Sequence, residues 1–498
     1  MLGSLWALAS PLFSVPDEPA HAIRAVAASR GQILPGERTS KQYSTYVEVP
    51  GVFKSASGVP SCYAFKKNAT AGCEAPLTGS RKPTPVETNA GLYPPAYYAV
   101  AGLPSLPFPS ATGVYLMRIW SAALCAALLA SALASVWLLP ASRLVVAAIA
   151  VAVTPMVLFL VGSVNPNGIE IAAAVCFWAT LAVLLVRPDD RHLNRLFLRA
   201  GVAGTVLGLS RLGSPLWVVL IVGAVLAWAG WERAWTFLRD RRAWLVGAAV
   251  GLSSLSTLLW VRHYGTLRYT LGGAPGGTLD ENIRLSLGNA DTQIDRMIGV
   301  FGWLDTRSAT FSSYLWLFAL GALVLLGLAA AGRRQALVLV GLVVAVVVVP
   351  VALEAPRAGT QGFPWQGRYT LPLAVGVPIL AALQVDRSSL LSAPLTRRLS
   401  AVLLGAFGVG QLYAHVWATR RYTAGVDGAV DWITAGGWNP PLPVWTLFVA
   451  FVGALAAAAL WLQWTAAQPS ERLQADSLSA LLRPIDPTLQ REPMQVAP

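Results

Sequence analysis

Long apolar runs separated by short polar segments recur along most of this chain of 498 residues. A run of about 20 apolar residues is long enough to cross a lipid bilayer as a helix. The pattern predicts an all-α polytopic membrane protein with a single transmembrane domain over residues 1–464. Twelve spans are predicted, over residues 2–15, 114–139, 144–163, 168–186, 200–211, 215–230, 244–261, 313–331, 335–353, 369–385, 399–417 and 444–464.

Two parts of this pattern allow more than one interpretation. The first run, 2–15, is shorter than a usual span, so either its helix enters the membrane only part of the way or the native start lies upstream. Residues 200–230 are interpreted as two short spans joined by a turn at 211–215, not as one interrupted helix. A single crossing would place the arginine-rich segment 231–242 outside, against the positive-inside rule.

The charged residues give the predicted protein an orientation. Thirteen arginines fall in four segments between spans, and such clusters mark the cytoplasmic side: 187–199, 231–242, 332–334 and 386–398. Both termini are then cytoplasmic, including the polar tail 465–498, which we expect to be poorly ordered. The largest outward segments are a first outer loop over 16–111 and a second over 262–312.

Composition agrees with a membrane protein and argues against nucleic-acid binding. Hydrophobic residues make up 55% of the chain and charged residues 12%, and the mean hydropathy is +0.56. The net charge of +13 is explained by topology, so we expect membrane lipids and no nucleic acid as partners. The chain has no GxxxxGK(S/T) nucleotide-binding sequence, so any chemistry is expected on the outer face.

Cysteine and histidine positions give two further expectations. Cys62 and Cys73 lie in a polar segment and enclose ten residues. They can form a disulfide if this segment faces an oxidising space, or they can remain two unpaired thiols. The histidines at 21, 192, 263 and 415 have no metal-ligand spacing, so no metal site is predicted from them.

The stretch "SVPDEPAHAIRAVAASRGQILPGE", residues 14–37, predicts a helix over 18–29 directly after the first run. Pro16 ends the run, Asp17 can cap the helix, and Gly31 can close it. Asp17, His21 and Arg24 then share one helical face. Two interpretations are open: a solvated surface helix with a local ion pair, or acids held at the membrane interface as part of a site.

Five sequence motifs, taken in order, resemble a bacterial family of membrane proteins catalogued as domain of unknown function 2142. They are "PDEPAH", "LYPPAYY", "TPMVLFLVGSVNPNGIE", "FGWLDT" and "QGRYTLP", and the resemblance runs from residue 16 to about residue 372. That family in turn resembles the GT-C glycosyltransferases. The resemblance implies a GT-C-like bundle of about twelve transmembrane helices with a large extracytoplasmic first loop.

The same resemblance implies an activity. GT-C enzymes transfer a sugar from a polyprenyl-phosphate donor to an extracytoplasmic acceptor, with inversion at the anomeric carbon. Here the acceptor would be a glycan or lipid of the cell envelope. By position, Asp17 corresponds to the general base, and Glu18 is its neighbour in the acidic pair, able to orient Asp17, to hold the acceptor or only to end the helix. These two acids could also hold a divalent cation, although other members of the superfamily work without metal.

Further residues are candidates for binding substrate. Arg368, between Gln366 and Tyr369, is placed to bind a lipid phosphate, although an interfacial arginine can also simply reach towards water. Arg211 interrupts an apolar stretch, so its charge needs a partner. The remaining candidates are His21, Arg24, Tyr93 and Asp305, the last of which is either a second site acid or a helix cap.

Alternatives stay open for two parts of the chain and for the function. Residues 163–170 ("SVNPNGIE") can be an ordinary turn or can supply polar groups to a site, and Arg118 can contact the phosphate or can simply snorkel. A transporter or flippase for lipids or lipid-linked sugars would also have twelve spans, but the halves show no repeat and the notable charges lie at the outer edge. Another possible function is that of a non-catalytic envelope-assembly protein with a GT-C-like fold.

Overall fold

The computed structural model describes residues 1–41, 43–139, 142–186, 192–268, 277–388, 390–429, 431–434 and 436–467, with side chains up to Trp461. The chain divides into two units, Met1–Val452 and Gly453–Pro498, and every site discussed below lies in the first. The prediction that the tail 465–498 is poorly ordered falls almost entirely on residues outside the described ranges.

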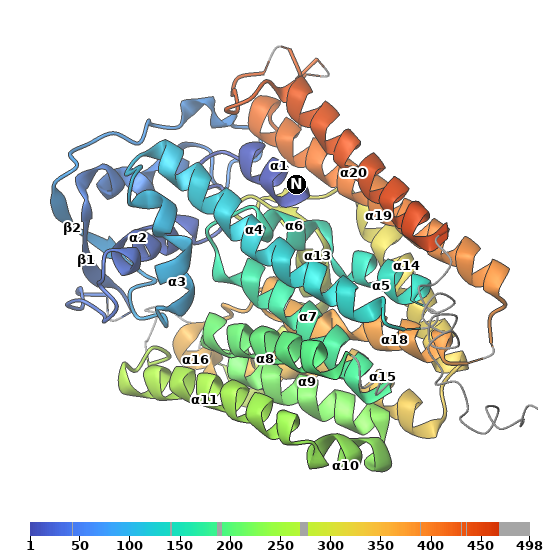
Figure 1. Ribbon diagram of the computed structural model, residues 1–498. Coiled ribbons are helices and arrows are strands. Elements are labelled where there is room, and N and C mark those ends of the chain that lie inside the picture. Colours follow the sequence, from blue (N-terminus) through green and yellow to red (C-terminus); the bar gives the residue numbers. More distant parts are fainter. Residues whose placement is uncertain are drawn as a thin grey trace, which may run out of the picture. The chain divides into compact units, whose positions relative to one another are not determined.

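The described part of the chain is mostly helical, with two small antiparallel strand pairs (Figure 1). The strands are β1 Thr45–Pro50, β2 Pro83–Thr88, β3 Val300–Phe301 and β4 Thr306–Arg307. The helices are α1 Leu2–Leu8, α2 Glu18–Ser29, α3 Ala96–Ala101, α4 Ala111–Val136, α5 Arg143–Ala152, α6 Pro155–Val161, α7 Pro166–Val186, α8 Leu193–Ser210, α9 Ser214–Ala229, α10 Trp231–Arg239, α11 Arg241–His263, α12 Leu279–Gly288, α13 Ala290–Ile298, α14 Thr310–Ala329, α15 Arg333–Glu354, α16 Ala358–Gln361, α17 Leu371–Ala374, α18 Gly376–Asp386, α19 Ala393–Ala424 and α20 Val444–Ala467. Short 3₁₀ turns lie at Gly51–Cys62, Ala71–Cys73, Leu103–Ser105, Ala355–Arg357 and Gly367–Tyr369.

Seven of the described helices are long and apolar enough to cross a membrane, and the number rises to nine if each of two bent pairs counts as one span. The bent pairs are α5 with α6, at 69°, and α9 with α10, at 119°. A shorter apolar helix covers residues 371–386. The protein is therefore a membrane protein with several spans, while the count of twelve is not confirmed.

Two of the uncertain spans have clear outcomes. Residues 200–230 form two separate helices, α8 and α9, because the backbone of Arg211 between them is extended, with φ −150° and ψ 169°. Within the run 2–15 only α1, seven residues long, is helical. The span predicted there is therefore longer than the helix that forms. The chain leaves the helix ahead of Pro11 and then turns back at Phe13, where φ is 61°.

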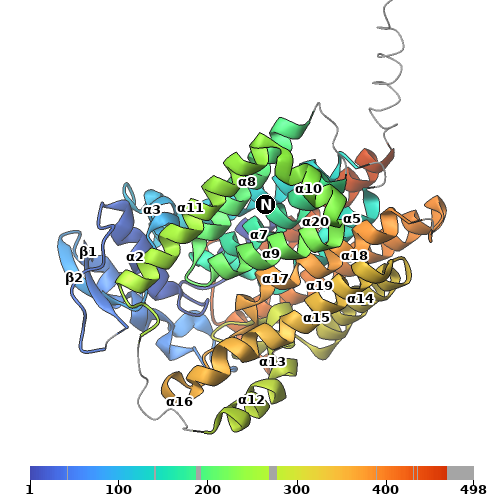
Figure 2. The ribbon, with the colours of Figure 1, turned by 90° about the horizontal axis from the view of Figure 1, so that it is seen from below.

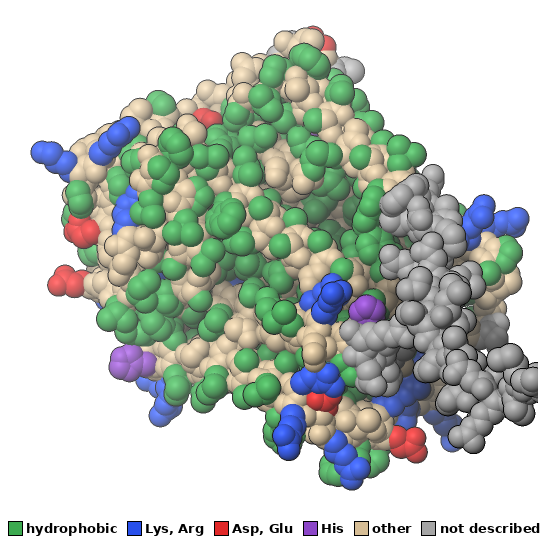
Figure 3. Space-filling model, viewed as in Figure 1, with side chains coloured by type: hydrophobic (Ala, Val, Ile, Leu, Met, Phe, Trp, Pro, Cys, Tyr) green, Lys and Arg blue, Asp and Glu red, His purple; other side chains and the backbone are tan. Residues whose placement is uncertain are grey.

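Helix α7 is the inner helix of the bundle. Its most apolar stretch is 94% buried, against 17–39% for the other helices of membrane length. It packs on α4, α6, α8, α9, α17 and α18, and Gly376 allows α18 to approach the ring of Trp178. The other long helices expose wide apolar faces, and hydrophobic side chains cover much of the surface in Figure 3, as expected for contact with lipid.

The segment between α1 and α4 folds as a small subdomain of short elements. Helix α2 packs on α3 and on the β1–β2 pair, in which Val47 lies opposite Val86. Figures 1 and 2 both show α2, α3, β1 and β2 side by side. Cys62 and Cys73 are joined by a disulfide in this subdomain. The helix predicted over residues 18–29 is present with these bounds, and it carries Asp17 at its start.

Candidate functional site

Asp17 immediately precedes α2 in an unusual backbone conformation. Its φ is 66° and its ψ −2°, in the left-handed region that aspartate tolerates better than most residues. The side chain makes no capping hydrogen bond, so the expected cap is wrong. Instead Arg368 Nη2 donates to Asp17 Oδ2 over 2.7 Å. The Arg368 side chain is 3% exposed and that of Asp17 is 51% exposed, so a buried cation holds a carboxylate that solvent can reach.

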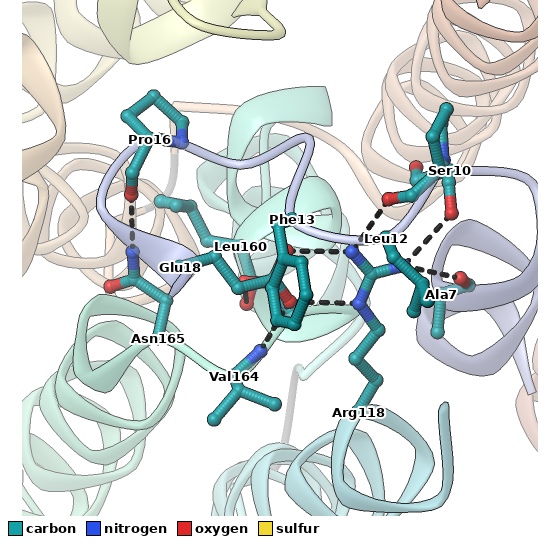
Figure 4. A network of polar contacts seen from close by, with 12 residues as sticks. Ala7, Ser10, Leu12, Phe13, Pro16, Glu18, Arg118, Leu160, Val164 and Asn165 are labelled. Atoms are coloured by element: carbon teal, nitrogen blue, oxygen red, sulfur yellow. Dashed lines mark hydrogen bonds and ion pairs between the residues drawn. The ribbon is translucent and has the colours of Figure 1, made fainter. Parts of the chain in front are cut away.

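The Glu18 side chain lies in a buried network (Figure 4). Arg118 donates to both carboxylate oxygens, from Nε over 2.8 Å and from Nη2 over 2.6 Å. The backbone N–H of Val164 donates to Oε1 over 3.0 Å. Both charged side chains are fully buried, so the interpretation of Arg118 as a snorkelling residue is wrong. Glu18 is the neighbour of Asp17 in sequence, but it is not accessible to a substrate in this arrangement.

The same network ties the segment before α2 to the helix bundle. Arg118 also donates to the carbonyl oxygens of Ala7, Ser10 and Pro11. Asn165 Nδ2 donates to the carbonyl of Pro16 over 3.2 Å, directly before Asp17 (Figure 4). Residues 163–165 form a buried bend in which Asn165 supports the backbone ahead of Asp17, and residues 166–170 begin α7, so this segment supplies polar groups as well as a turn.

Arg211 and Arg368 both lie against the aromatic ring of Tyr369. Its guanidinium carbon is 4.4 Å from the ring centroid of Tyr369, and that of Arg368 is 5.1 Å from the same centroid. Arg211 Nη1 pairs with Glu170 Oε2 over 3.3 Å, and Ser214 Oγ donates to Glu170 Oε1 over 2.6 Å. The sequence predicted that the Arg211 charge needs a partner, and Glu170 on α7 is that partner.

His21 lies close enough to the same group of charges to respond to them. Its Nδ1 is hydrogen-bonded to the Tyr98 hydroxyl over 2.8 Å, and its ring contacts that of Tyr93 at 5.7 Å. Burial lowers the pKa of His21 to about 3, opposed by Asp17 and helped by Arg211 and Arg368. His21 is therefore neutral near pH 7 and buried, so the solvated surface helix is excluded.

Three predicted site residues form no hydrogen bond or ion pair with Asp17, Arg211 or Arg368 in the part of the chain that the structure describes. Arg24 is buried and donates to the carbonyls of Gln32 and Ile33, which closes the end of α2, and to the carbonyl of Tyr93 over 3.4 Å. Asp305 pairs with Arg421 over 3.3 Å, and it caps no helix, because the N-cap of α14 is Ala309. Gln366 has a buried Oε1 without a hydrogen-bond partner among the described residues.

One further cation near Arg368 was not predicted from the sequence. Arg296 on α13 lies near Arg368, because Gly367 packs directly on the α13 backbone at Gln293. Partial burial and the charge of Arg368 lower the pKa of Arg296, opposed by Glu354. No hydrogen bond or ion pair joins its side chain to a described residue. Arg296 lies five residues before "FGWLDT", but nothing in the local sequence sets it apart.

A divalent cation does not fit this donor set. No group of three metal-ligating side chains was found among the residues that the structure describes. Asp17 pairs with Arg368, Glu18 with Arg118 and Glu170 with Arg211, so each of these carboxylates already has a guanidinium partner. Carboxylates paired in this way do not form a metal site, and the guanidinium groups are suited to an anionic ligand.

Comparison with known proteins identifies the family. Two solved structures are similar, ArnT from Cupriavidus metallidurans bound to undecaprenyl phosphate and the same protein in the apo state, at 13% and 14% identity. Each likeness has a TM-score of 0.43 and covers 92% of this chain and 70% of the other. No curated protein sequence matches. Residues 1–377 match a family model described as a predicted membrane protein, and the chain therefore belongs to the DUF2142 family.

Proposed function

We propose that this protein is a membrane glycosyltransferase that moves a sugar from a polyprenyl-phosphate donor to an acceptor of the cell envelope. The observation that carries the proposal is the pairing of Asp17 with Arg368, in a group that also contains Arg211 and Tyr369. A half-exposed carboxylate and buried cations in one place are what transfer from a phosphate leaving group requires. The sequence resemblance to the GT-C enzymes points to the same chemistry.

In the proposed reaction Asp17 is the general base. The acceptor hydroxyl oxygen attacks the anomeric carbon from the face opposite the phosphate, and its proton passes to the Asp17 carboxylate. The bond between the anomeric carbon and the phosphate oxygen breaks, and its electron pair leaves with the polyprenyl phosphate. One displacement of this kind inverts the anomeric configuration. Glu18 takes no direct part, and it supports Asp17 through the buried pair with Arg118.

The arginines supply the charge that the leaving phosphate needs. Arg368 and Arg211 each have a buried Nε without a hydrogen-bond partner among the described residues. Arg296 adds a third guanidinium nearby. Guanidinium groups bind phosphate through paired hydrogen bonds, and their charge favours the products once the phosphate carries more negative charge. His21 and Tyr93 form the neutral wall of the site and are proposed to contact the sugar.

We also infer that the site faces the outside and that both termini are cytoplasmic. Helix α9 begins at Ser214, which bonds to Glu170 in the site, and it ends at Ala229, beside the arginine-rich α10. Its sixteen residues span about 24 Å, so the site and this arginine-rich end lie at opposite ends of one span. Arginine-rich ends are cytoplasmic.

Labelling with a membrane-impermeant maleimide tests this orientation. In intact cells the reagent should modify Lys54→Cys, which replaces an exposed residue of the small subdomain. It should modify Arg239→Cys, at the exposed end of α10, only after the cells are lysed. Labelling of Arg239→Cys in intact cells would reverse the proposed topology.

Donor binding tests the role of Arg368. Arg368→Lys keeps the charge but loses the planar pair of N–H donors, so we expect the purified protein to bind polyprenyl phosphate roughly 10-fold to 100-fold more weakly. Arg357→Lys, at an exposed arginine of the same loop, is the matched control and should bind as the unmodified protein does. Equal affinity of all three proteins would remove Arg368 from the phosphate site.

A further inference from the structure

A cavity lies at the arginine-rich end of the bundle, away from the candidate site. It has a volume of about 640 Å³ and is lined where α9, α10, α15 and α18 begin or end. None of its lining residues belongs to the group around Asp17. Ligand cavities in proteins commonly measure roughly 300–1,000 Å³, so this one is large enough for a lipid headgroup.

The helices around the cavity have features of a region where a span leaves the bilayer. Helices α9 and α10 meet at Gly230, whose φ of 92° permits the 119° bend between them. Beyond the bend, Trp231 is 73% exposed and Trp235 stacks on it. Arg239 lies over the ring of Trp235 at 5.0 Å. A short helix with exposed tryptophans and arginines is typical of the lipid headgroup region.

The walls of the cavity provide cations that the fold itself does not use. Arg334 and Gln335 donate to the carbonyls that end α9, and Gln384 donates to the end of α14, so these side chains stabilise the helix ends. Arg233 and Arg387 have no hydrogen bond or ion pair with any described residue.

The like charges of Arg233 and Arg387 repel each other. Burial and the charge of Arg233 lower the pKa of Arg387, whose guanidinium lies 5.5 Å from the ring centroid of Trp228. Glu232 is the one acid among the lining residues. The arrangement holds an excess of positive charge against an aromatic wall. In Figure 3, blue arginine side chains gather at the place where Figure 1 shows α10.

We propose that this cavity binds the phosphate headgroup of an anionic phospholipid, in the inner leaflet for the orientation inferred above. Arg233 and Arg387 would share the phosphate, which removes their mutual repulsion. Trp228 and Trp231 would lie beside the glycerol region. A soluble phosphate compound offers the same charge, but the position at span ends and the exposed tryptophans of α10 favour a ligand with acyl chains.

Native mass spectrometry of the purified full-length protein in neutral detergent can test the proposal. Titration with phosphatidylglycerol should give one tight adduct that phosphatidylcholine does not give. Arg233→Gln/Arg387→Gln should weaken that adduct roughly 30-fold, because each arginine near a lipid surface contributes about a fivefold factor. The control Arg397→Gln/Arg398→Gln removes two exposed arginines of the neighbouring segment and should change the affinity less than about threefold.

Two outcomes would overturn the proposal. An equal loss of phosphatidylglycerol affinity in both double variants would mean that lipid binding depends only on the overall charge of the protein. Displacement of the phosphatidylglycerol adduct by inorganic phosphate at low millimolar concentration would mean that the cavity takes a soluble phosphate compound. The test uses no donor and no transfer assay, so its result is independent of the proposed glycosyltransferase activity.

Discussion

Replacing Asp17 with asparagine should lower sugar transfer by about 100-fold to 10,000-fold, because a general base contributes that much to a transfer step. The fold should survive, for two reasons visible at this residue. Asparagine tolerates the left-handed backbone as well as aspartate does. The carboxylate caps no backbone N–H, and an amide oxygen can still accept the hydrogen bond from Arg368.

The comparison requires protein of equal yield and homogeneity. The matched control is Asp427→Asn, which alters a carboxylate that is 63% exposed and paired only with surface residues. Its transfer rate should stay near that of the unmodified protein. Donor affinity of Asp17→Asn should change little, since the loss concerns turnover. Near-normal transfer by Asp17→Asn would remove Asp17 from the mechanism. If the unmodified protein binds the donor normally but transfers no sugar, it is a non-catalytic member of the fold.

Removing one partner of the Glu18–Arg118 pair should cost about 3–5 kcal/mol of stability, the usual penalty for leaving a buried charge alone. Arg118→Met leaves the Glu18 carboxylate without its cation and frees three carbonyls in the segment before α2. We expect a large fall in the thermal unfolding midpoint in detergent and a poor yield.

A second substitution separates charge from packing in this prediction. Glu18→Gln in the Arg118→Met background removes the isolated charge, so part of the lost stability should return. The control is Asp240→Asn, which breaks the partly exposed pair with Arg242 and should cost at most about 1 kcal/mol. An Arg118→Met protein as stable as the control would show that the buried pair does not hold the segment before α2.

The sequence predicts those features that depend on near neighbours. Prolines at 16 and 19 and the glycine at 31 define the helix over 18–29, and the apolar runs define the long helices. The need of Arg211 for a partner also follows from its place in an apolar stretch. The identity of the partner does not, because Glu170 is 41 residues away on another helix.

The errors have the same origin. Asp17 has the local signature of a cap, but its side chain accepts a hydrogen bond from a residue 351 positions later. Arg118 has the pattern of a snorkelling arginine, yet its partner is 100 residues away. Arg296 reaches the site only through the packing of Gly367 on α13. Where a charged side chain is buried, its tertiary partner determines its role more than the local sequence does.

The contact between Asp17 and Arg368 has a consequence for biosynthesis. Ribosomes synthesise a chain from its amino-terminal end, so Arg368 emerges 351 residues after Asp17. The Asp17 carboxylate is therefore presented early and gains its guanidinium partner late. A chain that ends ahead of Arg368 cannot form this pair, so the proposed transfer activity would require synthesis to pass that residue.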